Sequence, residues 1–121
     1  MDKEIAVQDN IFVSKVSPNG KLCGVFEFDG ETSYFYLYRI PIHKSEGKVL
    51  DFIHITSQTP KFSDKDVEVR WNNSGDSVGL YIFRHLWAVF CVSGQKYGGD
   101  YTAGGKAQIP DDISLSFAPS D

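Results

Sequence analysis

The sequence predicts an all-β protein, folded as a single-domain antiparallel sandwich or small barrel of about seven to eight strands. Short runs rich in β-branched and aromatic residues alternate with clusters of Gly, Asn, Asp, Ser and Pro, which is typical of strands and turns. No stretch carries the i, i+3, i+4, i+7 apolar pattern of an amphipathic helix. The length of 121 residues and the 41% hydrophobic content suit one domain, residues 1–121, that buries its own core.

Each expected strand is bounded by residues that favour turns. We expect strands at residues 11–16, 22–28, 33–40, 48–56, 66–71, 77–84 and 86–92, with a weaker eighth segment at 113–117. The turns include 17–20, Asp29-Gly30 and 72–76, where proline presets φ and glycine accepts a positive φ. The run 79–83 is apolar on both faces, which predicts a central strand. The apolar pattern breaks at His85, which we expect in a tight turn.

The charge balance disfavours nucleic acid as a partner. The chain has 12 basic and 16 acidic side chains, a formal net charge of −4. A phosphate backbone requires a basic surface, which this composition does not supply. The apolar stretches are also much shorter than the roughly 20 residues of a membrane-spanning helix, so we expect no membrane association.

The compartment is inferred from the N-terminus and the cysteines. No apolar stretch of a secretory signal follows Met1, so we expect a cytoplasmic protein. Cys23 and Cys91 form no Cys-x-x-Cys pair, and each lies in an apolar run, which favours buried, reduced thiols. The alternative is a disulfide between the two cysteines, which requires two strands to bring them together.

Alternation along residues 33–40 places Tyr34, Tyr36 and Tyr38 on one face of a strand and Phe35 and Leu37 on the other. One interpretation is a buried Phe/Leu face with a tyrosine ladder that serves cross-strand packing. The other is an aromatic recognition surface, because tyrosine combines a large area with a polar tip.

The glycine-rich segment near residues 93–108 predicts an irregular loop, and residues 118–121 suggest a frayed C-terminus. Tyr97, Asp100 and Tyr101 make this loop a candidate for ligand or partner binding. It is not a Walker phosphate loop, since Gly105 stands where lysine is required, and Lys106 is followed by Ala107 rather than by a residue with a hydroxyl group. We therefore expect no cofactor.

The histidines give no local metal motif, because His43, His54 and His85 lie on different expected elements. Asp51 and His54 point to opposite faces of one expected strand. A Ser-His-Asp arrangement stays open, because its members need be neighbours only in space. No Gly-x-Ser-x-Gly elbow is present, so a catalytic role is the less favoured interpretation.

Several segments together resemble a family of small bacterial proteins classed as a domain of unknown function. They are Val25 to Tyr36, Ser45 to Ile55, Val67 to Trp71, Gly79 to Ile82 and Ala88 to Phe90. The resemblance covers roughly residues 25–101. The chain departs from the family pattern at Ser33, where glycine is expected, at Asn73 and Ser74, and at Cys91, where aspartate is expected. The resemblance implies a bacterial cytoplasmic protein and no particular activity.

Small size, mild acidity and an aromatic strand face favour a non-enzymatic binding module, of immunity or adaptor type, that binds another protein. Its candidate binding residues are Tyr34, Tyr36, Tyr38, Tyr97, Asp100 and Tyr101. The alternative is a small-molecule-binding or hydrolytic protein that uses His54 with Asp51 or Asp100. A third hypothesis is a homo-oligomer formed through an exposed strand edge.

Overall fold

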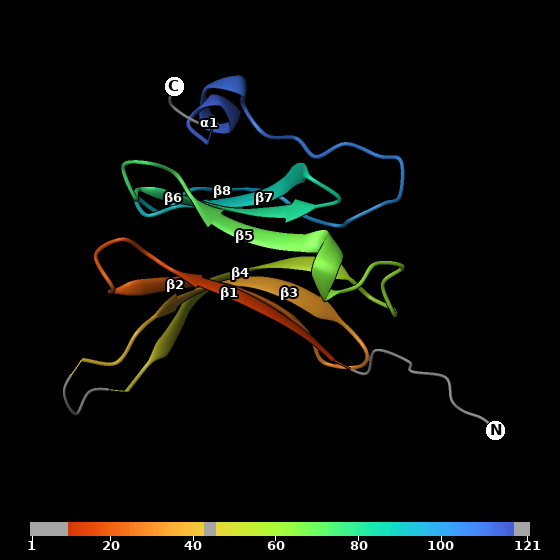
Figure 1. Cartoon of the computed structure of the whole chain (residues 1–121), viewed down its shortest axis with the longest axis horizontal. Coiled ribbons are helices and arrows are strands. Elements are labelled where there is room, and N and C mark those ends of the chain that lie inside the picture. Colours follow the sequence, from red (N-terminus) through yellow and green to blue (C-terminus); the bar gives the residue numbers. More distant parts are fainter. Residues whose placement is uncertain (1–9, 43–45, 118–121) are drawn as a thin grey trace.

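The protein is a sandwich of two four-stranded antiparallel sheets, seen in a computed structural model that describes residues 10–42 and 46–117 (Figure 1). The first sheet contains β1 (Ile11–Val16), β2 (Leu22–Phe28), β3 (Ser33–Arg39) and β4 (Lys48–Thr56). The second contains β5 (Val67–Trp71), β6 (Ser77–Ile82), β7 (His85–Cys91) and β8 (Lys96–Gly98). In each sheet the strands follow chain order, so each half of the chain forms one meander. The predicted β-sandwich is confirmed.

Seven of the expected strands are present within one or two residues of their predicted ends, and β6 is central as predicted. The expected strand at 113–117 is wrong: this segment contains the short helix α1 (Asp111–Leu115). Pro110 precedes α1, and Asp111 and Asp112 lie in its first turn, where carboxylates favour a helix N-terminus. The glycine-rich segment is not wholly irregular, because it contains β8. The C-terminal residues 118–121, expected to be frayed, lie outside the described residues.

The β6–β7 turn lies earlier than the sequence predicts. Ile82 pairs with His85, so the turn residues are Phe83 and Arg84, with φ of 51° and 68°. Two-residue hairpin turns need positive φ at both central positions, which Asn and Gly normally supply. Phe and Arg give no such signal, so the sequence predicts the turn at His85, where the apolar pattern breaks.

The core fills the space between the two sheets. Phe35 of β3 and Phe90 of β7 meet across it with ring centroids 5.0 Å apart. Fully buried side chains from both sheets surround this pair and include Ile11, Phe26, Phe28, Ile55, Val78, Leu80 and Ile82. Gly24 allows the sheets to approach closely, because a Cβ at this position would lie 2.6 Å from Val78 Cγ2.

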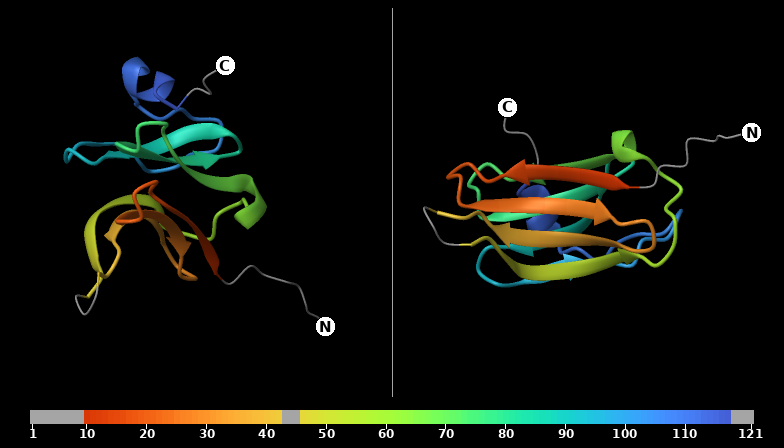
Figure 2. Two further views of the ribbon diagram at one scale, coloured as in Figure 1. Left: turned by 60° about the vertical axis from the view of Figure 1, so that its left-hand side comes forward. Right: turned by 90° about the horizontal axis from the view of Figure 1, so that it is seen from below.

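The outer faces of the two sheets differ. On the second sheet, Val89 and Cys91 pack with Phe117 and Ile113 from the α1 region. On the first sheet, no element of the described residues crosses the outer face (Figure 2). The sheet curves strongly, and its concave side faces away from the second sheet (Figure 2). The first sheet therefore presents a concave face that the described part of the chain leaves uncovered.

Candidate functional site

Three consecutive residues with positive φ carry the chain from the second sheet to the first. Gly98, Gly99 and Asp100 have φ of 88°, 126° and 41°. The next backbone groups pair with the end of β4: Asp100 N–H donates to His54 O at 2.9 Å, and Tyr101 N–H to Ile55 O at 2.8 Å. Trp87 Nε1 donates to Gly99 O at 2.9 Å and so holds the backbone of this turn in place. These contacts place the Asp100 side chain beside His54.

His54 binds a carboxylate through one ring nitrogen and a hydroxyl through the other. Its Nδ1 lies 2.8 Å from Asp100 Oδ1, and its Nε2 lies 2.9 Å from Ser57 Oγ. A carboxylate only accepts hydrogen bonds, so Nδ1 carries the proton in this arrangement. In the neutral imidazole Nε2 is then an acceptor, and Ser57 Oγ–H donates to it.

These three side chains border an open cleft of about 480 Å³ between the end of β4 and the 100–103 segment. His54 and Asp100 line it together with Ser57, Thr59 and Lys61. His54 is one-third exposed and Asp100 is 86% exposed, so both are accessible to a ligand from solvent.

Asp51 does not take part in this cluster. Its Oδ1 accepts from Lys96 Nζ at 2.8 Å, and the lysine also donates to Phe52 O. The structure therefore brings His54 together with Asp100, whereas Asp51 is paired with β8.

The Asp51–Lys96 pair predicts a pH effect on stability. The hydrogen bond from Lys96 lowers the pKa of Asp51 below its ordinary value of 3.8. A carboxylate whose pKa is lowered by folding stabilises the folded state at pH values above its ordinary pKa. This stabilisation is lost as the pH falls through the lowered pKa of the folded state. We expect the thermal unfolding temperature, measured by circular dichroism, to fall below about pH 4, and to fall less steeply in Lys96→Met. An equal slope in both proteins would contradict this assignment.

The three strand tyrosines lie on the outer face of the first sheet, as predicted. Tyr34 and Tyr36 are stacked with ring centroids 6.2 Å apart. Tyr34 also contacts the His54 ring edge-on at 5.4 Å, so the tyrosine ladder ends at the His54 cluster. Burial, and then the negative charges of Glu27 and Asp29, raise the pKa of Tyr36.

The same face contains an apolar trough with a cavity volume of about 530 Å³. Its lining comes from all four strands of the first sheet and from the residue after β3, and comprises Phe12, Ser14, Val16, Cys23, Val25, Glu27, Tyr36, Tyr38, Ile40 and Val49. Among the described residues of this lining, Glu27 is the one carboxylate, and none is a lysine or arginine. Cys23 and Cys91 are both free and buried, and burial raises the pKa of the Cys23 thiol.

The other two candidate tyrosines lie elsewhere. Tyr97, on β8, packs on the outer face of the second sheet near Ile113. Tyr101 packs edge-on against Trp87 at 4.8 Å and Phe62 at 5.3 Å. The structure therefore joins Asp100 to the tyrosine ladder through His54, while Tyr97 and Tyr101 lie against other aromatic or apolar groups.

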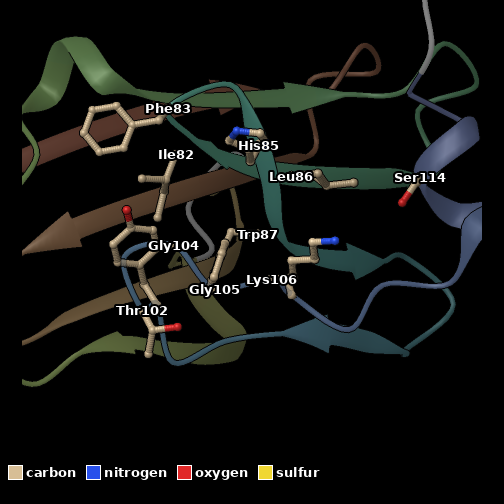
Figure 3. A pocket seen from close by; sticks show the side chains of 12 residues that line it. Ile82, Phe83, His85, Leu86, Trp87, Thr102, Gly104, Gly105, Lys106 and Ser114 are labelled. Carbon is tan, nitrogen blue, oxygen red and sulfur yellow. The ribbon is translucent and has the colours of Figure 1, made fainter.

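A larger cavity than the cleft and the trough, of about 680 Å³, lies between the β6–β7 hairpin and the 101–107 segment (Figure 3). His85, Lys106 and Ser114 approach it from three elements (Figure 3). Within the described residues no hydrogen bond joins these three side chains, so this cavity has no organised polar cluster. Of the described residues, no three His, Cys, Asp or Glu side chains are placed to hold a metal ion, and no described helix is long and apolar enough to cross a membrane.

Comparison with protein-family models matches residues 5–97 to a family described as uncharacterised proteins conserved in bacteria, DUF2251. The chain belongs to this family. No curated protein and no solved structure gives a match. The DUF2251 match confirms the resemblance inferred from the sequence and covers the whole first sheet, including His54 and Ser57. Asp100 and α1 follow the matched segment.

Ser57 is the residue that sequence reasoning missed. It lies in the bend directly after β4, three positions beyond His54. The end of the strand is the one available signal. Because the chain turns after β4, the residue three positions beyond His54 can fold back onto its imidazole ring. Without the bend's geometry, the spacing alone gave no reason to select Ser57.

Proposed function

We propose that this protein is a binding module whose concave trough holds an amphipathic, basic helix of a partner protein. The observation that carries the proposal is the difference between the two outer faces. The second sheet is covered by α1, whereas the first exposes a curved apolar face.

Four large apolar side chains of this face are exposed to solvent. Phe12 is 63% exposed, Val16 50%, Val49 46% and Phe52 53%. Phe52 and Val49 of β4 pair with Tyr36 and Tyr38 of the tyrosine ladder. Phe12 and Val16 of β1 pair with Glu27 and Cys23, which in turn pair with Tyr34 and Tyr38, so all four apolar residues flank the ladder on one face. Contiguous apolar patches with tyrosines are typical of protein-binding sites.

The shape of the face favours a helix as occupant. Four strands spaced by about 4.8 Å span about 14 Å, which accommodates a helix of about 10 Å diameter. A second copy of this chain is a poorer fit, because a two-fold contact places the same concave face on both sides.

The charge of the face favours a basic partner. Glu27 lines the trough, and the negative charges of Glu27 and Asp29 act on Tyr36 at its centre. The net charge of −4 adds long-range attraction for a basic protein. We therefore place a lysine or arginine of the partner helix beside Glu27.

The test begins with a photo-crosslinking amino acid at position 12, irradiated in cells that make the protein. The cross-linked segment is then synthesised as a peptide and titrated by calorimetry against purified variants. We expect a basic amphipathic peptide, helical when bound. Tyr36→Ala should weaken its binding by about tenfold or more, and Glu27→Gln should weaken it several-fold and reduce its salt dependence.

Leu115→Ala is the matched control, because Leu115 is a 69% exposed apolar residue on α1, away from the trough. It should leave the affinity unchanged. Recovery of no adduct, of this chain itself, or of an acidic peptide would contradict the proposal, as would equal binding by Tyr36→Ala.

We also propose a cytoplasmic location. The two free, buried thiols support it, since a reducing compartment preserves unpaired cysteines.

A further inference from the structure

We propose that Ser57, His54 and Asp100 form a catalytic relay that hydrolyses esters of small acyl groups. The carboxylate, imidazole and hydroxyl are connected in that order, with contacts of 2.8 Å and 2.9 Å. This is the arrangement by which a serine hydroxyl is activated as a nucleophile. It is independent of the trough and of any protein partner.

Each residue has a defined role. Asp100 accepts from His54 Nδ1–H, which holds the proton on that nitrogen and directs the Nε2 lone pair at Ser57 Oγ–H. Ser57 Oγ attacks the ester carbonyl carbon while its proton passes to Nε2. The tetrahedral intermediate collapses, the C–O bond to the alcohol breaks, and the alcohol leaves with the proton from Nε2. Water then attacks the acyl-serine by the same path, releasing the acid and restoring Ser57.

The cleft beside Ser57 suits a small substrate. Its volume of about 480 Å³ is at the lower end of the range of ligand pockets. Gln58, Thr59 and Lys61 also line it. Their side chains can donate hydrogen bonds, and the Lys61 ammonium can stabilise the charge that develops on the carbonyl oxygen.

The side-chain relay is not needed to attach the 100–101 segment to β4. Two backbone hydrogen bonds, from Asp100 N–H and Tyr101 N–H, already hold it there. Asp100 also has a φ of 41°, a conformation that costs free energy in a non-glycine residue. A carboxylate that is held on a strained backbone and accepts from a histidine, which in turn accepts from a serine, is the arrangement expected at a site of chemistry.

The open site predicts slow turnover and unequal effects of the three residues. Asp100 is 86% exposed, so water competes for its hydrogen bond and we expect Asp100→Asn to reduce the rate by only about tenfold. Loss of the general base should have a larger effect: we expect His54→Gln to reduce the rate of hydrolysis by about a hundredfold or more.

The experiment uses the full chain with two probes. A fluorophosphonate reagent reports nucleophilic serines, and digestion followed by mass spectrometry locates the adduct. Hydrolysis of p-nitrophenyl acetate is followed from the release of p-nitrophenolate. We expect an adduct on Ser57 and a rate that falls to the uncatalysed level in Ser57→Ala.

Ser93→Ala is the matched control, since Ser93 is an exposed serine whose hydroxyl bonds Gln95 rather than a histidine. It should keep both the Ser57 adduct and the rate. Circular dichroism of every variant separates loss of the relay from loss of the fold. The proposal is overturned if wild-type protein gives no Ser57 adduct, if Ser93 is labelled equally, or if Ser57→Ala or His54→Gln hydrolyses the ester as fast as wild type.

Discussion

Replacing Gly98 with alanine is expected to lower the free energy of unfolding by about 2–5 kcal/mol. Gly98 has a φ of 88°, which costs an L-residue about 1–2 kcal/mol. In addition, a Cβ at this position would meet the backbone oxygen of Trp87 and would lie 2.9 Å from Ala88 Cα. Backbone cannot move aside as a flexible side chain can, so overpacking adds about 1–3 kcal/mol.

Gly104→Ala separates the two contributions. Gly104 has a φ of 77° and no atom within 4 Å of the added Cβ. It should therefore lose only the backbone part, about 1–2 kcal/mol, in urea denaturation followed by tryptophan fluorescence. Equal losses in both variants would show that the contact with Trp87 and Ala88 carries no cost. Gly98→Ala should also displace Asp100 and reduce fluorophosphonate labelling of Ser57.

Phe35→Ala is expected to have the largest effect on stability of any single change considered, a loss of about 3–5 kcal/mol. Phe35 is fully buried on β3 and packs against Phe90 of the opposite sheet at 5.0 Å. Truncation removes apolar contacts and leaves a cavity between sheets that the paired strands cannot close. Urea denaturation of both proteins at one temperature measures the difference.

Phe12→Ala is the control for this second prediction, because Phe12 is an aromatic residue of the same sheet that is 63% exposed. We expect a change of about 0.5 kcal/mol or less. A loss in Phe12→Ala similar to that in Phe35→Ala would mean that the outer face of the first sheet is packed rather than open, and would also contradict the proposed trough.

The strands were predictable because their signals are local. Alternation along residues 33–39 placed Phe35 and Leu37 inside and the tyrosines outside, and the structure has this arrangement. The turn at Asn72 was recognisable for the same reason: its side-chain oxygen accepts from the backbone N–H groups of Asp76 and Ser77. Periodicity and turn chemistry act over a few residues, so one sequence suffices to detect them.

The site depends on contacts that a single sequence does not encode locally. His54 and Asp100 are 46 positions apart, and their meeting depends on the stacking of the two sheets and on the backbone of Gly98 and Gly99. The sequence supports a pair of His54 with Asp100 and a pair of His54 with Asp51 equally. Helix α1 was misread because its five residues are too short for a helical period to stand out.

The pairing of residues 100–101 with β4 has a consequence for the order of folding. Each sheet is a meander of neighbouring strands, so its contacts are short in sequence and can form early. The His54–Asp100 contact joins one meander to the chain that leaves the other, and loop-closure entropy delays such contacts. The relay therefore assembles only when the two meanders dock, and a partly folded chain with either sheet detached would lack it.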